Sequence, residues 1–250
     1  MTFPFAELSL ACPAYNEADG IEKIVEGWLT YLRALPGLER FEIIVCNDGS
    51  RDATGSILDK LAAANPEVRP VHHKVNQGAG AALATAIAGT RLQWVALIDA
   101  DGQFPVDNIV SLAQAIAASK GLAAIGVRLG KKDTLFARFG TWSSAGLCNL
   151  FHGTHLRDFN SAFKLVAGDV LRSLRLEAKG LNYSTEISSK LLEKRVEMAE
   201  VDIRHLPRAH GTSSLRAVRD AVHRFLFVIY IGVRQWLLRL KILHVPHVMM

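Results

Sequence analysis

Cysteine is scarce in this sequence: the 250 residues contain three, Cys12, Cys46 and Cys148, far apart and without a Cys-x-x-Cys pair. This spacing argues against a disulfide framework and against a zinc site built from thiolates. Two of the three lie in apolar segments of strand character. We therefore expect reduced thiols in the core of a cytoplasmic protein.

Long apolar runs are missing as well. The longest covers the nine residues 225–233, whereas a membrane-spanning helix needs about 20 residues. Arg234, Arg239 and Lys241 interrupt any extension, so we expect no transmembrane helix. The N-terminus lacks a basic segment followed by an apolar stretch, and we expect no secretory signal. Repeats and low-complexity linkers are also absent, which favours one compact domain.

Acidic residues are nearly absent from the C-terminal part. From Arg204 onward the chain has eight Lys or Arg and one acidic residue, Asp220, while the rest has 21 basic and 23 acidic residues. The formal net charge of +5 therefore belongs to the tail. A basic tail suggests an anionic partner such as lipid head groups or phosphates. Because the tail offers few aromatic residues spaced for base stacking, we expect no nucleic acid.

Strand and helix signals alternate through the first 127 residues. Apolar, often β-branched segments predict strands at 8–12, 41–46, 68–72, 94–98 and 122–127. Helical spacing fills the intervals, at 21–35, after residue 50 to 61, at 79–88 and at 109–118. The second half is less regular, with helices predicted near 135–150, 185–194 and 213–243 and strands at 161–166 and 196–205. This order predicts an α/β fold with a mainly parallel sheet flanked by helices.

Polar or glycine-rich turns follow four consecutive predicted strands. They are PAYNE at 13–17, NDGS at 47–50, NQGAG at 76–80 and DADGQ at 99–103. In open α/β sheets, ligands bind beyond the carboxyl ends of the strands. The sequence therefore predicts a binding site where these four turns meet.

The fourth turn is the most specific. Asp99 and Asp101, two residues apart after an apolar strand, can face one metal ion, with Gln103 two residues further on. Mg²⁺ and Mn²⁺ prefer oxygen ligands and leave positions for substrate phosphates. The alternative is an Asp-rich turn without a metal, followed by Pro105.

Two other turns leave alternatives open. Gly78 and the following glycine precede an Ala-rich helix, so they could form a phosphate loop or allow a tight turn and close packing. A nicotinamide fingerprint is not favoured, because Leu83 stands at its third glycine position. Asp48 could accept hydrogen bonds from a base or ribose, or make an Asx turn before the next helix.

Several basic residues are candidate phosphate ligands, since a guanidinium binds phosphate in a bidentate manner. They are Arg128, Arg138 and Arg208, the last in a small polar loop at 207–214 that could close over a ligand. Each could equally be a solvated surface residue. His72 and His73 have no acidic partner in the sequence pattern, so we do not expect them to be ligands.

The four turns, in this order and spacing, resemble the family-two inverting glycosyltransferases of the GT-A fold. Within that family the chain is most similar to the dolichyl- and polyprenyl-phosphate sugar synthases, of which dolichol-phosphate mannosyltransferases are one group. The segments 157–164 and 207–214 support this placement. The resemblance covers roughly residues 8–214, although Lys164 stands where such enzymes often have Arg.

The resemblance implies roles for single residues. On the donor side, four would surround the nucleoside: Pro13, Tyr15, Glu17 and Asp48. Three would hold Mg²⁺ or Mn²⁺ on the diphosphate: Asp99, Asp101 and Gln103. On the acceptor side, the resemblance implies phosphate contacts from Arg128 and Arg138, a donor or acceptor phosphate contact from Arg208, and a site shaped by Asp158 and Glu186.

The implied reaction moves a hexose from GDP-mannose or a UDP-sugar to a polyprenyl or dolichyl phosphate. The acceptor oxygen would attack the anomeric carbon opposite the leaving diphosphate and invert its configuration. An ionised phosphate needs no strong base, whereas a hydroxyl acceptor would need one, with Asp158 or Glu186 as candidates. The alternatives are a glycan or small soluble acceptor, and a non-catalytic nucleotide-binding module.

The tail, residues 213–250 after a catalytic domain at 1–212, predicts an amphipathic helix. Its apolar residues recur at helical spacing: Val218, Val222, Phe225, Ile229, Val233, Leu237 and Leu240. Such a helix with a basic surface can lie on an anionic membrane, bind a partner or pack on its own domain. We expect a peripheral protein at the inner face of the cell membrane.

Overall fold

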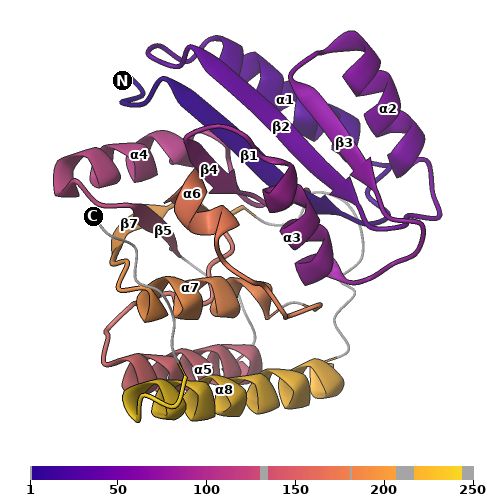
Figure 1. Ribbon diagram of the computed structural model, residues 1–250. Helices are drawn as coiled ribbons and strands as arrows, with labels where there is room; N and C mark the ends of the chain where they lie inside the picture. Colours follow the sequence, from indigo (N-terminus) through magenta and orange to yellow (C-terminus); the bar gives the residue numbers. More distant parts are fainter. Residues whose placement is uncertain (1, 130–134, 181, 207–216, 244–250) are drawn as a thin grey trace.

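The computed structural model describes residues 2–129, 135–180, 182–206 and 217–243, with backbone alone for 135–143 and 217–224. Seven strands form one sheet in the order β3-β2-β1-β4-β6-β5-β7 (Figure 1). They are β1 (Glu7–Ala14), β2 (Arg40–Asn47), β3 (Val68–His72), β4 (Trp94–Leu97), β5 (Ala123–Arg128), β6 (Lys164–Ala167) and β7 (Met198–Ile203). Every neighbouring pair is parallel except those of β6, which runs antiparallel to β4 and β5. The predicted mainly parallel α/β sheet is confirmed.

The helices connect these strands and cover the sheet. They are α1 (Ile21–Arg33), α2 (Thr54–Ala64), α3 (Ala79–Gly89), α4 (Asn108–Ser119), α5 (Leu135–His152), α6 (Gly168–Arg172), α7 (Tyr183–Glu193) and α8 (Ala217–Arg239). All helices predicted from the sequence are present, with ends shifted by a few residues. The five-residue α6 was missed because it is too short to show a helical period.

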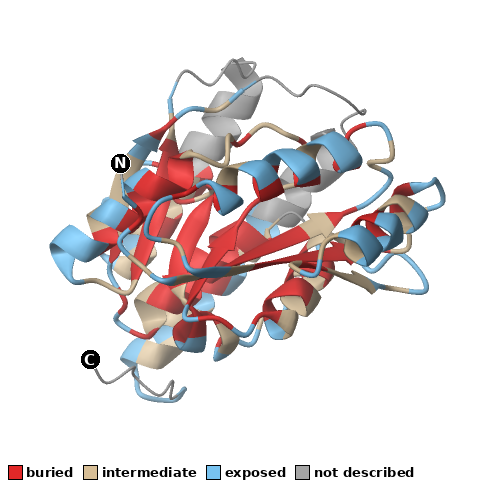
Figure 2. Cartoon of the chain, turned by 90° about the horizontal axis from the view of Figure 1, so that it is seen from above, coloured by how far each residue is buried: buried red, intermediate tan, exposed pale blue. Residues whose placement is uncertain are grey.

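The core follows the strands. Leu8, Leu10 and Cys12 on one face of β1 and Ser9 and Ala11 on the other are all fully buried. Figure 2 shows this burial along the whole sheet, with the exposed residues on the outer sides of the helices. Burial on both faces explains why these strands read as continuous apolar runs. All three cysteines are buried free thiols.

A second layer of helices lies below the sheet, where α5 and α8 run side by side and α7 separates them from the strands (Figure 1). Val228 and Ile231 of α8 are buried there against Cys148 of α5 and against Phe159. This small cluster is separate from the main core. The boundary expected at residues 212 and 213 falls outside the described residues and stays a prediction.

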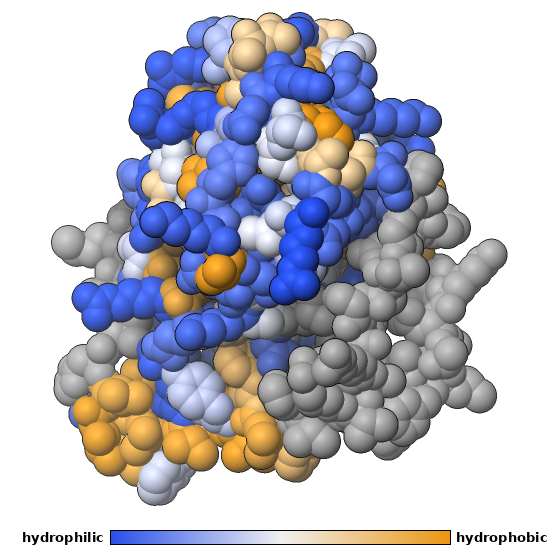
Figure 3. All heavy atoms as spheres, turned by 90° about the vertical axis from the view of Figure 1, so that its right-hand side faces the viewer, coloured by the Kyte–Doolittle hydropathy of each residue, from blue (hydrophilic) through white to orange (hydrophobic). Residues whose placement is uncertain are grey.

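The outer face of α8 is apolar as well. Its exposed residues are Phe225, Leu226, Ile229, Tyr230, Val233, Trp236 and Leu240. Figure 3 shows apolar side chains gathered along the lower edge of the molecule, at the level of α5 and α8. Phe225, Ile229, Val233 and Leu240, four residues of the stripe predicted from the sequence, face outward, while Val228 and Ile231 pack on the domain. In the described part of the chain, no helix combines the length and the apolarity needed to cross a bilayer.

Candidate functional site

The turns after β1, β2, β3 and β4 meet at one edge of the sheet. Ala14, the last residue of β1, pairs with Asn47, the last of β2, which pairs with His72 of β3. The backbone N–H of Asn16 donates to the Ser50 hydroxyl at 2.9 Å, which ties the first turn to the second. Parallel pairing thus brings the polar segments together, as expected.

Asp48 organises the third turn. Its carboxylate is 1% exposed and accepts the backbone N–H of Gln77 at 2.9 Å and of Gly78 at 2.8 Å. It does not make the Asx turn before α2, because the N–H of Ser50 donates to Asn47 Oδ1 instead, at 3.1 Å. A nucleoside contact by Asp48 stays a prediction.

Both histidines at the end of β3, His72 and His73, have acidic partners, so the expectation that they lack one is wrong. Nδ1 of His73 lies 2.7 Å from Asp48 Oδ1, and Nε2 of His72 lies 3.0 Å from Asp59 Oδ1. The partners are 25 and 13 residues away in the sequence, which is why a local pattern misses them. His73 also contacts the Thr85 hydroxyl at 2.9 Å, so it joins the second turn to α3.

Gly78 and Gly80 allow a close approach of two backbones. A Cβ on Gly78 would lie 2.2 Å from the Lys179 carbonyl oxygen, and one on Gly80 would lie 1.8 Å from that of Ala178. Gly78 has a φ of +98°, which also requires glycine. The N–H of Gly78 donates to Asp48 and that of Gly80 to Lys179. Since both donors are used within the chain, the geometry favours the packing interpretation over a phosphate loop.

Negative charge gathers after β1 and β4. Burial, followed by the charges of Asp99, Asp101 and Glu17, raises the pKa of the Cys12 thiol well above its ordinary value. The Tyr183 hydroxyl, at the start of α7, donates to Asp99 Oδ1 at 2.7 Å. Asp101 is 8% exposed and accepts the N–H of Gln103 at 3.0 Å. Three carboxylates around one buried thiol are a setting that a cation would stabilise.

The donor set fits a hard divalent cation that shares its ligands with a substrate. Within the described ranges, no group of three or more His, Cys, Asp and Glu residues is placed to hold a metal by itself. Mg²⁺ is commonly bound by one or two carboxylates together with substrate phosphates, and Asp99 and Asp101 supply that number. The Gln103 amide donates to the Leu206 carbonyl oxygen at 3.2 Å, so its role as a metal ligand stays a prediction.

The remaining donor residues lie at the same edge. Pro13 is partly buried at the end of β1, and Tyr15 is 39% exposed. The N–H of Glu17 donates to the Thr54 hydroxyl at 2.9 Å, which fixes its backbone against α2. Their contacts with a nucleoside stay predictions.

On the acceptor side, Arg128 and Asp158 form a forked ion pair. Nε and Nη2 of Arg128 donate to the two carboxylate oxygens of Asp158 at 2.8 and 2.9 Å. Arg128 and Asp158 were predicted to have separate roles, whereas in the structure they are ion-pair partners. The side chain of Arg138 and the whole of Arg208 lie outside the described residues, and both assignments stay predictions.

Glu186 lies in α7 with 1% exposure. It accepts the backbone N–H of Glu177 at 2.8 Å and of Ala178 at 2.9 Å, and it pairs with Lys190 at 2.8 Å. These contacts support a positioning role, and an acceptor contact stays a prediction.

The sequence did not indicate the contacts of two further residues, Tyr183 and Lys164. Tyr183 reaches Asp99 across 84 residues, and no local pattern marks such a contact. Lys164, at the start of β6, is fully buried and donates to the Ser184 hydroxyl at 2.8 Å. Burial lowers the pKa of Lys164 to about 7.

The comparison with protein families identifies the chain. The sequence profile described as "Glycosyl transferase family 2" matches residues 9–170, which is more than half of the chain. The chain therefore belongs to glycosyl transferase family 2. The match ends at α6, so α7 and α8 of the second helical layer lie beyond it, whereas α5 lies within it.

Curated relatives agree with this family. Glycosyltransferase AglD of Haloferax volcanii is 30% identical over 86% of this chain and 35% of its own length. Dolichyl-phosphate beta-glucosyltransferase ALG5A of Trichomonas vaginalis is 27% identical over 78% of this chain and 66% of its own. Polyprenol monophosphomannose synthase of Mycolicibacterium smegmatis is 28% identical over 85% and 83%. The chain thus spans about a third of the first relative and about two thirds of the second.

Solved structures agree with the fold. Glucosyl-3-phosphoglycerate synthase from Mycobacterium tuberculosis, in complex with Mn²⁺ and UDP-glucose, aligns with a TM-score of 0.68 and 19% identity over 91% of this chain and 79% of its own. At this identity the similarity shows the GT-A fold alone.

Proposed function

We propose that the chain is a metal-dependent inverting hexosyltransferase that moves a sugar from a nucleotide diphosphate to a polyprenyl phosphate. The observation that carries this proposal is the pair Asp99 and Asp101 at the end of β4, near Glu17, in a chain of glycosyl transferase family 2. Several relatives are named as polyprenyl-phosphate sugar synthases, which supports the acceptor class.

The residues of the β1 to β4 edge would bind the donor. Pro13, Tyr15 and Glu17 would line the nucleoside, and Asp48 would hold the 76–78 turn beside it. Asp99 and Asp101 would hold Mg²⁺ or Mn²⁺, which neutralises charge on the leaving diphosphate when bound. A solved structure of the same fold contains Mn²⁺ and UDP-glucose, which supports this choice of cation and donor class.

The Arg128–Asp158 pair would serve the acceptor. Because Asp158 holds the guanidinium by two hydrogen bonds, Arg128 is oriented before a substrate arrives, and little side-chain entropy remains to be lost on binding. The oxygens of an acceptor phosphate would accept hydrogen bonds from the same guanidinium. Being ionised already, it needs no base to attack the anomeric carbon, so the protein acts mainly by positioning and charge.

The outer face of α8 would bring the enzyme to its lipid acceptor. Large apolar side chains there are exposed, with Trp236 at 60% and Phe225 at 58%, and Arg239 and Lys241 beside them are exposed cations. Apolar surface together with basic residues suits the surface of an anionic bilayer. This supports a peripheral position at the inner face of the cell membrane.

Donor and acceptor are tested with the purified full chain. Thermal stabilisation is measured with UDP-glucose and GDP-mannose, each with and without Mn²⁺, followed by transfer to undecaprenyl phosphate in detergent. We expect one nucleotide sugar to raise the Tm only with metal and to label the lipid phosphate. Transfer to 3-phosphoglyceric acid but not to lipid would establish the soluble-acceptor alternative, which the complex of the same solved protein with phosphoglyceric acid suggests. Absence of nucleotide binding would overturn the proposal.

Flotation with vesicles containing anionic lipid tests the membrane part. We expect Trp236→Ser and Phe225→Ser to reduce co-flotation several-fold each, because each removes a large apolar side chain from the bilayer. Val75→Ser removes a comparably exposed apolar residue, 67% exposed, from the loop after β3 and is the control. Unchanged flotation of both α8 variants would exclude this face.

A further inference from the structure

The segment 175–180, which we call the strap, lies between the donor edge, where the turns after β1 to β4 meet, and the second helical layer. Its Lys179 carbonyl oxygen accepts the N–H of Gly80 at 2.9 Å. The backbone atoms of Ala178 and Lys179 stand where side chains on Gly80 and Gly78 would be. The third turn, whose other side is held by Asp48, therefore rests directly on the strap.

Two buried charged side chains of helix α7 form hydrogen bonds with the backbone of the strap. Glu186 accepts two consecutive strap amides, and Lys190 bridges Glu186 and the Arg175 carbonyl oxygen. Both side chains are almost inaccessible, at 2% and 8% exposure. Such a buried network is costly to break, because removal of one partner leaves the other charge uncompensated. This side of the strap is a fixed support.

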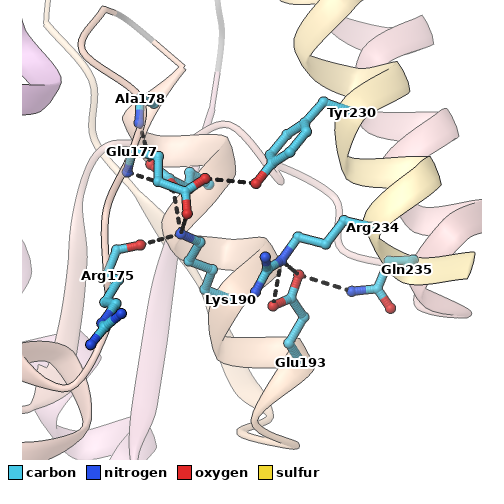
Figure 4. A network of polar contacts seen from close by, with 9 residues as sticks. Arg175, Glu177, Ala178, Lys190, Glu193, Tyr230, Arg234 and Gln235 are labelled. Carbon is cyan, nitrogen blue, oxygen red and sulfur yellow. Dashed lines mark hydrogen bonds and ion pairs between the residues drawn. The ribbon is translucent and has the colours of Figure 1, made fainter. Parts of the chain in front are cut away.

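Helix α8 also contacts the strap, through an accessible hydrogen bond to Glu177, whose carboxylate pairs with Lys190 of α7 at 3.6 Å as well. The Tyr230 hydroxyl donates to Glu177 Oε2 at 2.6 Å, and Arg234 next to it pairs with the buried Glu193 of α7 at 2.9 Å (Figure 4). Tyr230 is 39% exposed and the Glu177 side chain 56%. This hydrogen bond can open and close at little cost, unlike the contacts of Glu186.

The contacts of α7 form one stripe. Tyr183, Glu186, Lys190 and Glu193 recur at intervals of three and four residues, so they lie along one side of the helix. Tyr183 contacts Asp99, Glu186 contacts the strap, and Glu193 contacts α8. A single helix thus connects the proposed metal-binding carboxylate, the support of the third turn and the C-terminal helix.

We propose that Tyr230 and Glu177 are positioning residues through which α8 holds the strap, and with it the third turn, in the arrangement that binds the nucleotide sugar. The proposal rests on the proposed function, since it takes the turns after β1 to β4 as the donor site. Neither residue contacts the donor; both act through the Lys179 and Ala178 backbone on Gly78 and Gly80. A surface bound to the outer face of α8, which carries Tyr230, would therefore influence donor affinity.

Donor binding in a double-mutant cycle tests this proposal. The variants are Tyr230→Phe, Glu177→Ala and the pair, with Glu177→Gln as the conservative variant that keeps an acceptor for the tyrosine. Tyr31→Phe, which removes a hydroxyl from α1, is the matched control. For each, the Kd of UDP-glucose with Mn²⁺, the KM of donor and acceptor, kcat and the Tm are measured; GDP-mannose replaces UDP-glucose where the wild type prefers it.

We expect Tyr230→Phe to raise the Kd and KM of the nucleotide sugar about three- to tenfold, in proportion to the loss of one charge-assisted hydrogen bond. Glu177→Ala, which also removes the ion pair with Lys190, should raise them at least as much. The pair should lose no more than Glu177→Ala alone. Glu177→Gln keeps a neutral acceptor for the tyrosine and should lose less than Glu177→Ala, and Tyr31→Phe should remain near wild type. kcat and acceptor KM should change less than twofold, which a general loss of structure would not produce.

The failures of the two proposals differ. If the wild type binds neither nucleotide sugar, the proposed function is wrong, and the role of the strap falls with it. If the wild type binds and Tyr230→Phe binds equally well, or lowers the Tm with unchanged affinity, the positioning role alone is overturned. Losses that add up in the double variant would likewise overturn it, since the two residues would then act independently.

Discussion

The donor edge and the second helical layer are built on different principles. At the donor edge, neighbouring parallel strands bring four short turns together, and the polar residues follow one another within each turn. In the layer of α5, α7 and α8, the contacts that link it to the strap and to the donor edge join residues 53 and 84 positions apart, as in Tyr230–Glu177 and Tyr183–Asp99. The first region can therefore be read from local sequence, whereas the second becomes visible only once the chain is folded.

The largest expected effect lies at the donor edge. Asp101→Asn keeps an oxygen that can accept the Gln103 N–H but removes the charge, so metal-dependent turnover should fall about 10²- to 10³-fold. Circular dichroism and the Tm should remain close to those of the wild type. Asp59→Asn changes an exposed carboxylate on α2 and is the control. Full activity of Asp101→Asn would refute the metal-binding assignment.

In the acceptor half, the largest effect should come from breaking the forked pair. Asp158→Ala leaves the Arg128 guanidinium, 19% exposed, without its main partner, and should lower the free energy of unfolding by about 3 kcal/mol or more. Arg157→Ala removes an exposed guanidinium that pairs with Glu200 and Asp202 from the neighbouring position and should cost less than about 1 kcal/mol. Urea unfolding measures both, and equal losses would remove the distinction between the two pairs.

Acid should lower the stability of the chain through a buried histidine in the helical layer. Burial and the nearby Arg239 lower the pKa of His152 to about 4 from its ordinary 6.5. Between pH 6.5 and 4 the unfolded chain therefore binds a proton at this histidine that the folded chain does not bind. The free energy of unfolding falls as the pH drops from 6.5 towards 4, by up to about 3 kcal/mol. His152→Gln should reduce the change of the urea midpoint with pH in this range. The exposed His155→Gln should leave the slope unchanged.

The smallest effect is a gain in stability expected at Gly27, which is compared with a loss expected at Gly80. At Gly27 in α1, no atom lies within 4 Å of the position that a Cβ would take, so Gly27→Ala should stabilise the chain by about 0.5–1 kcal/mol. Gly80→Ala in α3 should destabilise it, because the new Cβ would meet the Ala178 carbonyl oxygen. Thermal unfolding of both variants gives the signs, and a stable Gly80→Ala would contradict the close packing of α3 on the strap.

Most of the sheet and the position of the acidic turn after β4 could be predicted, because each depends on a short signal. Asp99 and Asp101 stand two residues apart after an apolar strand, and β3 was predicted with its observed bounds. The partners of His73 and Asp158 could not be predicted, since nothing in either neighbourhood specifies the distant residue. Periodicity also fails for α8: it marks apolar positions, but two faces of that helix are apolar, and only packing decides that Val228 and Ile231 turn inward.

The antiparallel strand β6 has a consequence for how this scaffold diversifies. Its first residue, Lys164, lies opposite Leu97, the last residue of β4. The connection that carries Asp158 therefore lies at the same edge of the sheet as Asp99. Asp158 precedes the start of β6, whereas Asp99 follows the end of β4. Under the proposed function, changes of sequence in that connection would alter the acceptor side without changing the strand that precedes Asp99, so the two halves of the site could vary independently.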